Sequence, residues 1–157
     1  MMTVPFSIIK ALYYFISFKL WFPGKNREKV ILMEDGIAFK IFRHMRLKTP
    51  ATNPGGVILI VRFKFRQFSH KTNIRLSRIP ILMIAGFPGF QDKIWMIDWK
   101  TDYWQGVYQF KNAEAIKQYK GSFVLGIMNK RAQKETLSYQ IIPNQDIDTY
   151  LKKRFVS

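Results

Sequence analysis

The sequence predicts an α+β domain whose elements follow the order strand, helix, strand, strand, helix, strand. Three observations predict it: a period-two alternation over residues 57–66, two helical segments with polar caps, and a pair of aromatic-rich strands between those helices. The length of 157 residues suits one domain with an appended segment. With 48% hydrophobic and 16% aromatic residues the chain can bury a substantial core, which excludes a disordered protein.

The composition excludes several kinds of chemistry. The chain has no Cys, which excludes disulfides, thiolate nucleophiles and cysteine-based metal sites, and its two His cannot form a three-histidine metal centre within one chain. We therefore predict no metal site. The formal net charge of +16 favours polyanionic partners, namely anionic lipid headgroups, an acidic protein or nucleic acid. A solubilising surface without a specific partner is the alternative explanation of the charge.

Residues 5–22 (PFSIIKALYYFISFKLWF) are expected to form a helix that Pro23 and Gly24 end. Lys10 and Lys19 interrupt its apolar sequence, so it fits neither a membrane-spanning helix nor a secretory signal. On a helical wheel one narrow stripe opposes a wide apolar face. The stripe consists of Thr3, Ser7, Lys10, Tyr14, Ser17 and Trp21.

Two placements of this helix are open. It lies in a membrane interface, or it packs on its own domain or on a partner chain. In the first case Lys25, Arg27 and Lys29 would meet anionic lipid of the cytoplasmic leaflet. The sequence then predicts a cytoplasmic protein that is peripheral on the inner face of the cytoplasmic membrane.

Residues 30–48 are expected to form a second helix with a basic end. Ile37, Ile41 and Met45 recur at helical spacing. The residues that we expect to bind an anionic headgroup or a phosphate are Lys40, Arg43, His44 and Arg46. The alternative is that this cluster only complements the carboxyl end of the helix.

A break is predicted at residues 49–56 (TPATNPGG), where two Pro and two Gly stand together. We therefore divide the chain into a helical, apolar and basic N-terminal extension at 1–56 and a folded domain at 57–157.

The folded domain supplies the remaining predicted elements. After the strand at 57–66 we expect a helix at 69–86 interrupted by Pro80, strands at 92–99 and 103–110, a helix at 112–131, a strand at 136–143 and a short helix at 146–154. The β-α-β-β-α-β order is that of the ferredoxin-like fold, an antiparallel sheet with helices on one face. The other face would be bare and strongly apolar, which predicts that a second copy covers it in a homodimer.

Three runs in this domain resemble a known family: GFPGFQDKIWMID, GVYQF and NAEAIKQY. Together they are similar to the dimeric α+β-barrel superfamily, which holds the antibiotic-biosynthesis-type monooxygenases and a smaller monooxygenase-like group. The positions that carry the resemblance are Pro88, Gly89, Phe90, Trp95, Gly106, Val107, Tyr108, Ala113, Ala115 and Tyr119. The resemblance covers residues 57–143, and it is more specific for fold than for activity.

The resemblance implies a homodimer whose two sheets form one dimeric α+β barrel, with a pocket between sheet and helices in each protomer. Monooxygenases of this type act without a cofactor and oxidise electron-rich polycyclic phenols with molecular oxygen. Other relatives bind or degrade haem through a helix histidine, so haem is the alternative to no cofactor. This sequence departs from both patterns, and no catalytic residue of the family carries over to a position in it.

Two residues are catalytic candidates from their own chemistry. His70 begins the first helix of the domain, near the mouth of the expected pocket, where an imidazole can act as a general base or ligate haem iron. A surface histidine is the alternative. Arg62 shares a strand face with apolar residues, where a charge is costly unless it meets a ligand or a carboxylate. It would hold an anion in the pocket, or pair with Asp92 or Asp98.

The wall of the pocket is predicted to be aromatic. Trp95 and Tyr108 lie on neighbouring strands and Tyr119 on the second helix, with Asn73 as a polar anchor, and such a pocket suits a flat aromatic or lipophilic ligand. Core packing is the alternative for each ring.

The sequence thus predicts a cofactor-independent, monooxygenase-like protein that acts on or binds a lipophilic aromatic small molecule at a membrane surface. The first alternative is a non-catalytic, membrane-associated module that binds haem, lipid or a partner. Nucleic-acid binding is the least favoured hypothesis, because no recognised nucleic-acid motif accompanies the charge.

Overall fold

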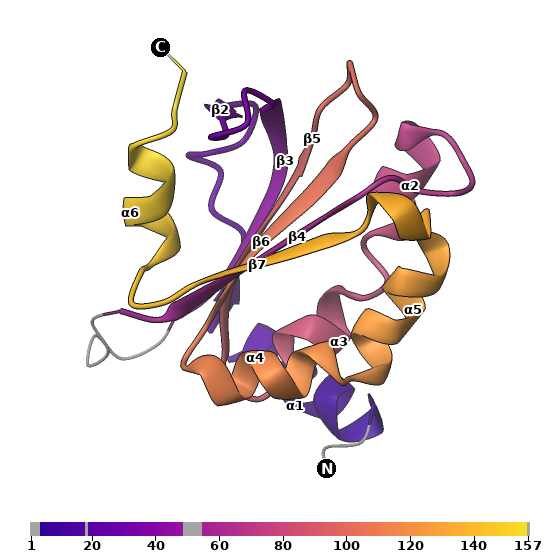
Figure 1. Ribbon diagram of the computed structural model, residues 1–157. Helices are drawn as coiled ribbons and strands as arrows, with labels where there is room; N and C mark the ends of the chain where they lie inside the picture. Colours follow the sequence, from indigo (N-terminus) through magenta and orange to yellow (C-terminus); the bar gives the residue numbers. More distant parts are fainter. Residues whose placement is uncertain (1–3, 18, 49–54, 157) are drawn as a thin grey trace.

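The computed structural model describes residues 4–17, 19–48 and 55–156, which form one open antiparallel sheet with helices on both faces (Figure 1). The strands are β1 (Leu20–Trp21), β2 (Val30–Leu32), β3 (Ala38–Leu47), β4 (Val57–Phe63), β5 (Phe90–Ile97), β6 (Trp104–Phe110) and β7 (Ser138–Ile142). Their order is β1-β3-β5-β6-β4-β7, and β2 pairs with β3. The sheet therefore has two free edges and is not a closed barrel.

Five helices lie on one face of this sheet, and a sixth lies on the other (Figure 1). The first five are α1 (Val4–Ile16), α2 (His70–Leu76), α3 (Ile81–Ala85), α4 (Ala113–Lys120) and α5 (Phe123–Arg131). A short 3-10 turn η1 (Lys134–Thr136) precedes β7, and α6 (Ile147–Lys152) ends the fold. The elements from β4 to β7 confirm the predicted ferredoxin-like order.

Local signals account for the helix boundaries of this domain. The Ser69 and Asn112 side chains cap α2 and α4 by accepting hydrogen bonds from backbone N–H groups two or three residues into each helix. Pro80 separates α2 from α3 as expected, because its ring is incompatible with a continuous helix. The predicted helix at 112–131 is divided at Gly121 into α4 and α5, with Ser122 as the cap of the second part.

The period-two pattern of β4 correctly predicts its two faces. Leu59, Val61 and Phe63 belong to the core beneath the helices α1 to α5, whereas Ile58 and Ile60 belong to the core beneath α6. Because both faces of β4 are buried, the face that carries Arg62 also carries the apolar residues Ile58 and Ile60.

The helix predicted at residues 30–48 is wrong, because these residues form β2 and β3. β3 is covered on both faces: Phe39 and Ile41 face α6, and Met45 faces the other helices. A bulge between Ile41 and Arg43 shifts the register, so the apolar residues lose strict alternation and fall by chance at helical spacing.

The sheet face opposite helices α1 to α5 was predicted to be bare and to be covered by a second copy. This prediction is wrong, because the chain covers that face itself. Ile147, Tyr150 and Leu151 of α6 are fully buried against it, together with Ile31 and Met33 from the segment around β2. The chain thus covers this face itself. Part of the predicted break, residues 49–54, lies outside the described residues. On either side of it β3 and β4 belong to the same sheet, so the N-terminal segment is helical only in α1.

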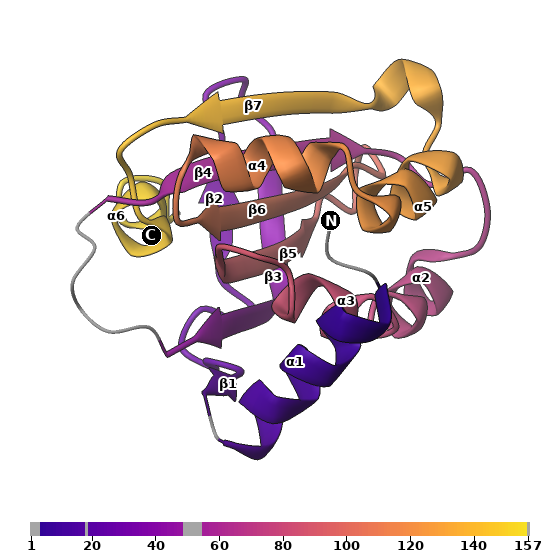
Figure 2. The ribbon, with the colours of Figure 1, turned by 90° about the horizontal axis from the view of Figure 1, so that it is seen from below.

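The helix predicted at residues 5–22 is confirmed only in its first part: α1 ends at Ile16, and Leu20 and Trp21 form β1, which pairs with β3. α1 packs with small and polar residues inward. It lies beside α3 and β1 (Figure 2), where Ser7 and Ala11 are buried and the Ser7 hydroxyl donates to the Met83 carbonyl oxygen at 3.0 Å. The large apolar side chains point outward; Ile9 and Ile16 are 65% and 73% exposed. None of the helices in the described part of the chain has the length and hydrophobicity needed to cross a bilayer.

Candidate functional site

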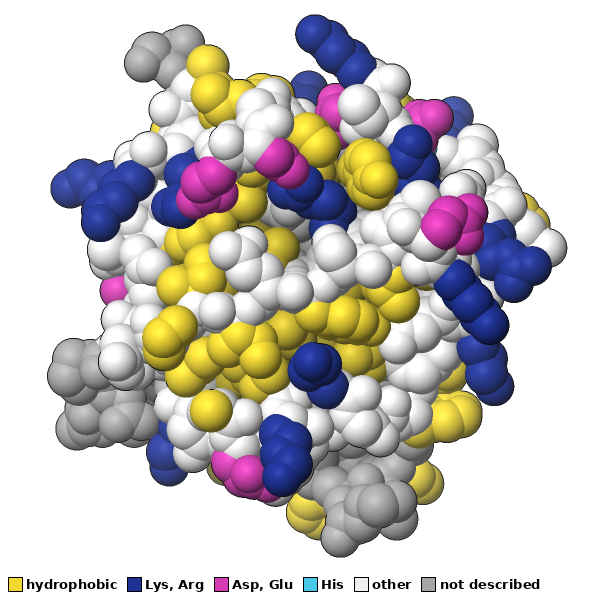
Figure 3. Space-filling model, viewed as in Figure 1, with side chains coloured by type: hydrophobic (Ala, Val, Ile, Leu, Met, Phe, Trp, Pro, Cys, Tyr) yellow, Lys and Arg dark blue, Asp and Glu magenta, His cyan; other side chains and the backbone are white. Residues whose placement is uncertain are grey.

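An apolar cavity of about 330 Å³ lies between the sheet and the helices, in the size range of small-molecule sites. We call it the apolar cavity. Its inner wall comes from β5 and β6, and its outer wall comes from α4, α5 and the α2–α3 connection. Ile79 and Ile127 stand at the rim, since both line the cavity and are exposed. Hydrophobic side chains gather between the sheet and the helices on the face shown in Figure 3.

Lys93 of β5 is the one amine that lines this cavity within the described residues, and it is only 3% exposed. Its Nζ donates to the Tyr108 hydroxyl at 2.7 Å and lies 4.2 Å from the centroid of the Trp95 ring. No carboxylate of the described chain forms an ion pair with it. Burial holds the pKa of Lys93 well below its usual range, and the nearby Arg43 charge lowers this pKa further. Burial therefore disfavours the charged form of this amine.

Two tyrosines add phenol groups to the lining of the apolar cavity, which also includes Ser77, Gln105 and Arg131. Tyr108 and Tyr119 are both about 1% exposed, and their ring centroids are 5.2 Å apart. Burial raises the pKa of each phenol above its usual value. Both therefore remain protonated at neutral pH and can donate hydrogen bonds to a ligand oxygen. The predicted trio of Trp95, Tyr108 and Tyr119 does line one cavity.

His70 lies behind the cavity wall and does not line the cavity. Its Nε2 is 2.7 Å from Asp102 Oδ1, and its Nδ1 accepts a hydrogen bond at 2.9 Å from Nε1 of Trp104, which does line the cavity. Both ring nitrogens are thus engaged, and the other histidine, His44, has no place in this cavity. The histidines of this chain therefore do not fit the ligation of haem iron in the apolar cavity.

The structure separates Asn73 and Arg62 from the apolar cavity. Asn73 is buried in α2, where its amide donates to the Gln67 and Phe68 carbonyls and accepts from Arg131 at 2.6 Å. Arg62 lies on the α6 side of β4; it donates to Gln105 Oε1 at 2.9 Å and pairs with Asp35. Its partner is neither Asp92 nor Asp98, the two carboxylates suggested by the sequence.

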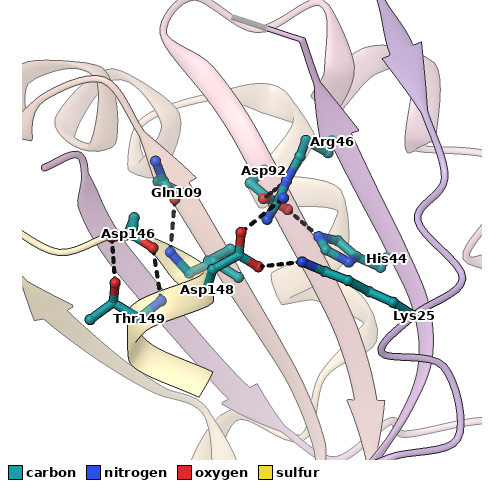
Figure 4. Close-up of polar contacts among 9 residues, drawn as sticks. Lys25, His44, Arg46, Asp92, Gln109, Asp146, Asp148 and Thr149 are labelled. Carbon is teal, nitrogen blue, oxygen red and sulfur yellow. Dashed lines mark hydrogen bonds and ion pairs between the residues drawn. The ribbon is translucent and has the colours of Figure 1, made fainter. Parts of the chain in front are cut away.

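The four predicted anion-binding residues are divided between two places. Lys40, Arg43 and His44 line a second cavity of about 490 Å³ beside the open edge of β3. Arg46 is elsewhere: with His44 it converges on Asp92, at 2.5 Å and 2.7 Å respectively, and it also pairs with Asp148 of α6 at 2.9 Å (Figure 4). Two carboxylates neutralise Arg46, so it holds α6 to the sheet.

Comparison of the sequence with protein-family models finds no match, and comparison with curated proteins finds none either. Solved structures do match the fold. A ferredoxin-fold protein from Listeria monocytogenes related to antibiotic biosynthesis monooxygenases matches with a TM-score of 0.53 at 12% identity, over 74% of this chain and 69% of that one. A monooxygenase-like protein from Listeria innocua matches with a TM-score of 0.52 at 12% identity, over 73% and 68% of the two chains.

A heme-degrading enzyme from Listeria monocytogenes also matches, with a TM-score of 0.53 at 11% identity over 85% of this chain and 92% of that one. Identities this low establish similarity of fold and not of activity. The chain therefore has the ferredoxin-like α+β fold found in antibiotic-biosynthesis-type, monooxygenase-like proteins, as the resemblance in its sequence implied.

Proposed function

We propose that the protein is a cofactor-independent, monooxygenase-like enzyme that acts on a lipophilic aromatic molecule with a phenolic hydroxyl. The observation that carries this proposal is the Lys93 amine, which is buried without a carboxylate in a cavity walled by Trp95, Trp104 and Tyr108. An apolar, aromatic wall favours a flat ring, and a neutral amine gives the site a base that can accept the proton of a phenol.

The reaction needs no electron donor besides the substrate. Lys93 accepts the phenolic proton, and the electron-rich phenolate adds molecular oxygen at a ring carbon. The hydrogen on that carbon passes as a proton to the outer oxygen of the resulting peroxide anion, the O–O bond breaks, and hydroxide leaves a carbonyl behind. Tyr108 and Tyr119 donate hydrogen bonds to the oxygen atoms on which negative charge develops. Lys93 returns its proton to the departing hydroxide, so that one phenol and one O₂ give one quinone and one water.

Lys93 replaces Arg62 and His70 as the proposed catalytic residue. Arg62 lies on the opposite face of the sheet, and His70 is held between Asp102 and Trp104. We assign His70 a positioning role, because its Nδ1 fixes the indole of Trp104 that forms part of the cavity wall.

Oxygen uptake with 1-naphthol as the probe tests the enzymatic proposal. We expect one O₂ consumed per naphthol, with the rate reduced about a hundredfold or more in Lys93→Met, since a general base contributes that much. Lys117→Met, an exposed lysine on α4, is the matched control and keeps the wild-type rate. Binding of naphthol is followed by quenching of Trp fluorescence. If the wild-type protein binds naphthol but takes up no oxygen, the enzymatic proposal is refuted. That outcome would leave the non-catalytic module as the function.

We further propose that α1 anchors the protein peripherally to an anionic membrane. The outward-facing apolar residues of α1 are Phe6, Ile9, Leu12, Tyr13, Phe15 and Ile16. Trp21 and Phe22 continue this exposed surface, and Lys10 and Lys19 flank it where their amines can reach lipid phosphates. Because α1 buries Ser7 and Ala11 and exposes its largest apolar side chains, these side chains are available to insert into a lipid bilayer.

Cosedimentation with vesicles of phosphatidylglycerol and phosphatidylcholine tests this anchor. The pair of changes Ile9→Ser and Ile16→Ser leaves the packed stripe of α1 intact and is expected to weaken binding about a hundredfold, because each buried isoleucine contributes about 1.5–3 kcal/mol. Leu32→Ser on β2, another exposed aliphatic residue, is the control. Equal binding by wild type and the double variant would exclude the anchor.

A further inference from the structure

The second cavity lies where the chain leaves the edge of β3 and returns to it. Trp21 pairs with Arg46 of β3, and the backbone N–H of Glu28 donates to the Ile41 carbonyl at 2.8 Å. The segment between these two contacts lines the cavity on one side, and the end of α2 with Trp99 lines it on the other. We call it the basic cavity. Its volume of about 490 Å³ exceeds that of the apolar cavity.

Several cationic side chains line the basic cavity, and few of them form ion pairs with carboxylates. Arg27, Arg43 and Arg78 all contribute to its wall, and no carboxylate of the described residues pairs with any of them. The carboxylate of Glu28 is committed to Lys40, whose Nζ lies 2.5 Å away. Burial, followed by the charges of Arg78 and Arg27, lowers the pKa of Arg43 to about 10.

His44 also lines this cavity, and one of its ring nitrogens has no partner in the described part of the chain. Its side chain is fully buried, and its Nε2 is held 2.7 Å from Asp92 Oδ1 (Figure 4). Its Nδ1 is buried and has no hydrogen-bond partner among the described residues. Buried polar atoms are nearly always hydrogen-bonded in native proteins, so the ring of His44 is a suitable reporter of what fills this cavity.

We propose that the basic cavity binds the phosphate group of a phosphate ester. Arg27 and Arg78 would contact the phosphate oxygens, and Arg43 would supply charge from the wall. Arginine matches the geometry of phosphate through paired N–H donors, and a dianion suits three uncompensated cations better than a carboxylate does. Phe42 and Trp99, which line the same cavity, offer an apolar wall to the organic part of the ester.

Arg43 also stabilises the fold, so it is left unchanged in the variants that test the proposal. Its Nη1 donates to Ser77 Oγ at 2.7 Å and its Nη2 to the Ile74 carbonyl at 3.2 Å, so it holds the end of α2 to β3. Arg27 and Arg78 are exposed, and their side chains carry no such contact among the described residues. The pair Arg27→Ala and Arg78→Ala therefore removes two of the proposed anchors and leaves the fold intact. Arg75→Ala, an exposed arginine of α2 outside both cavities, is the matched control.

Imidazole NMR of the ¹⁵N-histidine-labelled full chain gives the most direct measurement, because the chain has two histidines and His70→Gln assigns them. Titration with inorganic phosphate and with glycerol 3-phosphate at low salt is expected to shift the ring ¹⁵N resonances of His44, which lines the basic cavity, and not those of His70. The double variant should bind about a hundredfold more weakly, and Arg75→Ala should bind as wild type does. No shift of His44 at millimolar phosphate, or equal affinities in the double variant and wild type, would overturn the proposal.

The same titration distinguishes the two sources of a phosphate group. Binding of glycerol 3-phosphate without lipid supports a soluble phosphate ester, and a His44 shift that needs vesicles containing phosphatidic acid supports a lipid headgroup. An equal shift with acetate would overturn the proposal in favour of a general anion effect. The proposal does not depend on the apolar cavity, since Lys93 does not line the basic cavity and Lys93→Met should still bind phosphate.

Discussion

A single buried amine, Lys93, connects the chemistry of this protein to its stability. In the unfolded chain this group is protonated at neutral pH, because the ordinary pKa of a lysine amine is 10.5, whereas burial lowers the pKa in the folded state. The folded state therefore binds fewer protons, and stability rises with pH between the folded pKa and 10.5. Each pH unit in that interval is worth about 1.4 kcal/mol. This exceeds the roughly 1 kcal/mol that the hydrogen bond to Tyr108 contributes.

We predict that Lys93→Met stabilises the protein at pH 7, because an apolar side chain of similar length needs no deprotonation in order to be buried. Urea unfolding from about pH 7 to pH 9.5 should show the free energy of unfolding of the wild type rising toward that of the variant. Lys117→Met should follow the wild-type curve. Parallel curves for wild type and Lys93→Met would show that Lys93 is charged in the folded state.

The sequence contained the signal for Lys93, although the site prediction missed it. Period-two alternation along β5 places Lys93 and Trp95 on one face, and the same argument applied to β4 singled out Arg62. The two charges differ in their partners: Asp35, distant in sequence, reaches Arg62, and no carboxylate of the described chain reaches Lys93. Only the tertiary contacts reveal which of two buried charges is compensated. For the same reason, the sequence could not foresee the Asp102 and Trp104 contacts of His70.

Among the elements, α1 depends on one glycine for its position. A Cβ at Gly86, which follows α3, would lie 1.8 Å from the Ser7 carbonyl oxygen, so the backbones of α1 and the α3 end approach as only glycine allows. The hydrogen bond from Ser7 to Met83 needs this approach. Gly126 of α5 faces open space instead.

We predict that Gly86→Ala displaces α1 and costs about 1–3 kcal/mol of stability. Hydrogen exchange should show faster exchange for the α1 amides, while the β5 and β6 amides keep their protection relative to the global unfolding rate. Gly126→Ala is the matched control; it should be neutral or stabilising by up to about 1 kcal/mol, since alanine favours a helix. Unchanged α1 protection in Gly86→Ala would contradict the packing described for this helix.

The elements from β4 to β7 show a clear periodicity or a capping residue and were predicted well, whereas β3 shows neither and was predicted as a helix. Ser69, Pro80 and Asn112 mark boundaries by local chemistry, so the segments from β4 to β7 follow from the sequence. β3 has no such mark. Its burial on both faces and the bulge after Ile41 remove the alternation that identifies a strand, and its partner β5 is distant along the chain.

For the whole molecule, the predicted homodimer needs a different interface from the one that the sequence suggested. Because α6 covers the far face of the sheet, a second copy is expected at the free edge of β7, where Ile141 is 48% exposed. Light scattering at micromolar concentration should then give twice the 18.6 kDa mass of one chain. Ile141→Lys should restore the single mass. A wild-type monomer under these conditions would exclude the homodimer.

The placement of α6 has a consequence for how the protein is made. Every strand precedes α6 in the chain, so during synthesis on the ribosome the sheet can pair before its α6 face is covered. Until Ile147, Tyr150 and Leu151 emerge, Ile58, Ile94 and their neighbours remain open to other nascent chains and to chaperones. A polypeptide stopped after Ile142 should therefore accumulate in inclusion bodies, and coexpression with a chaperone that shields apolar strands should keep it dispersed.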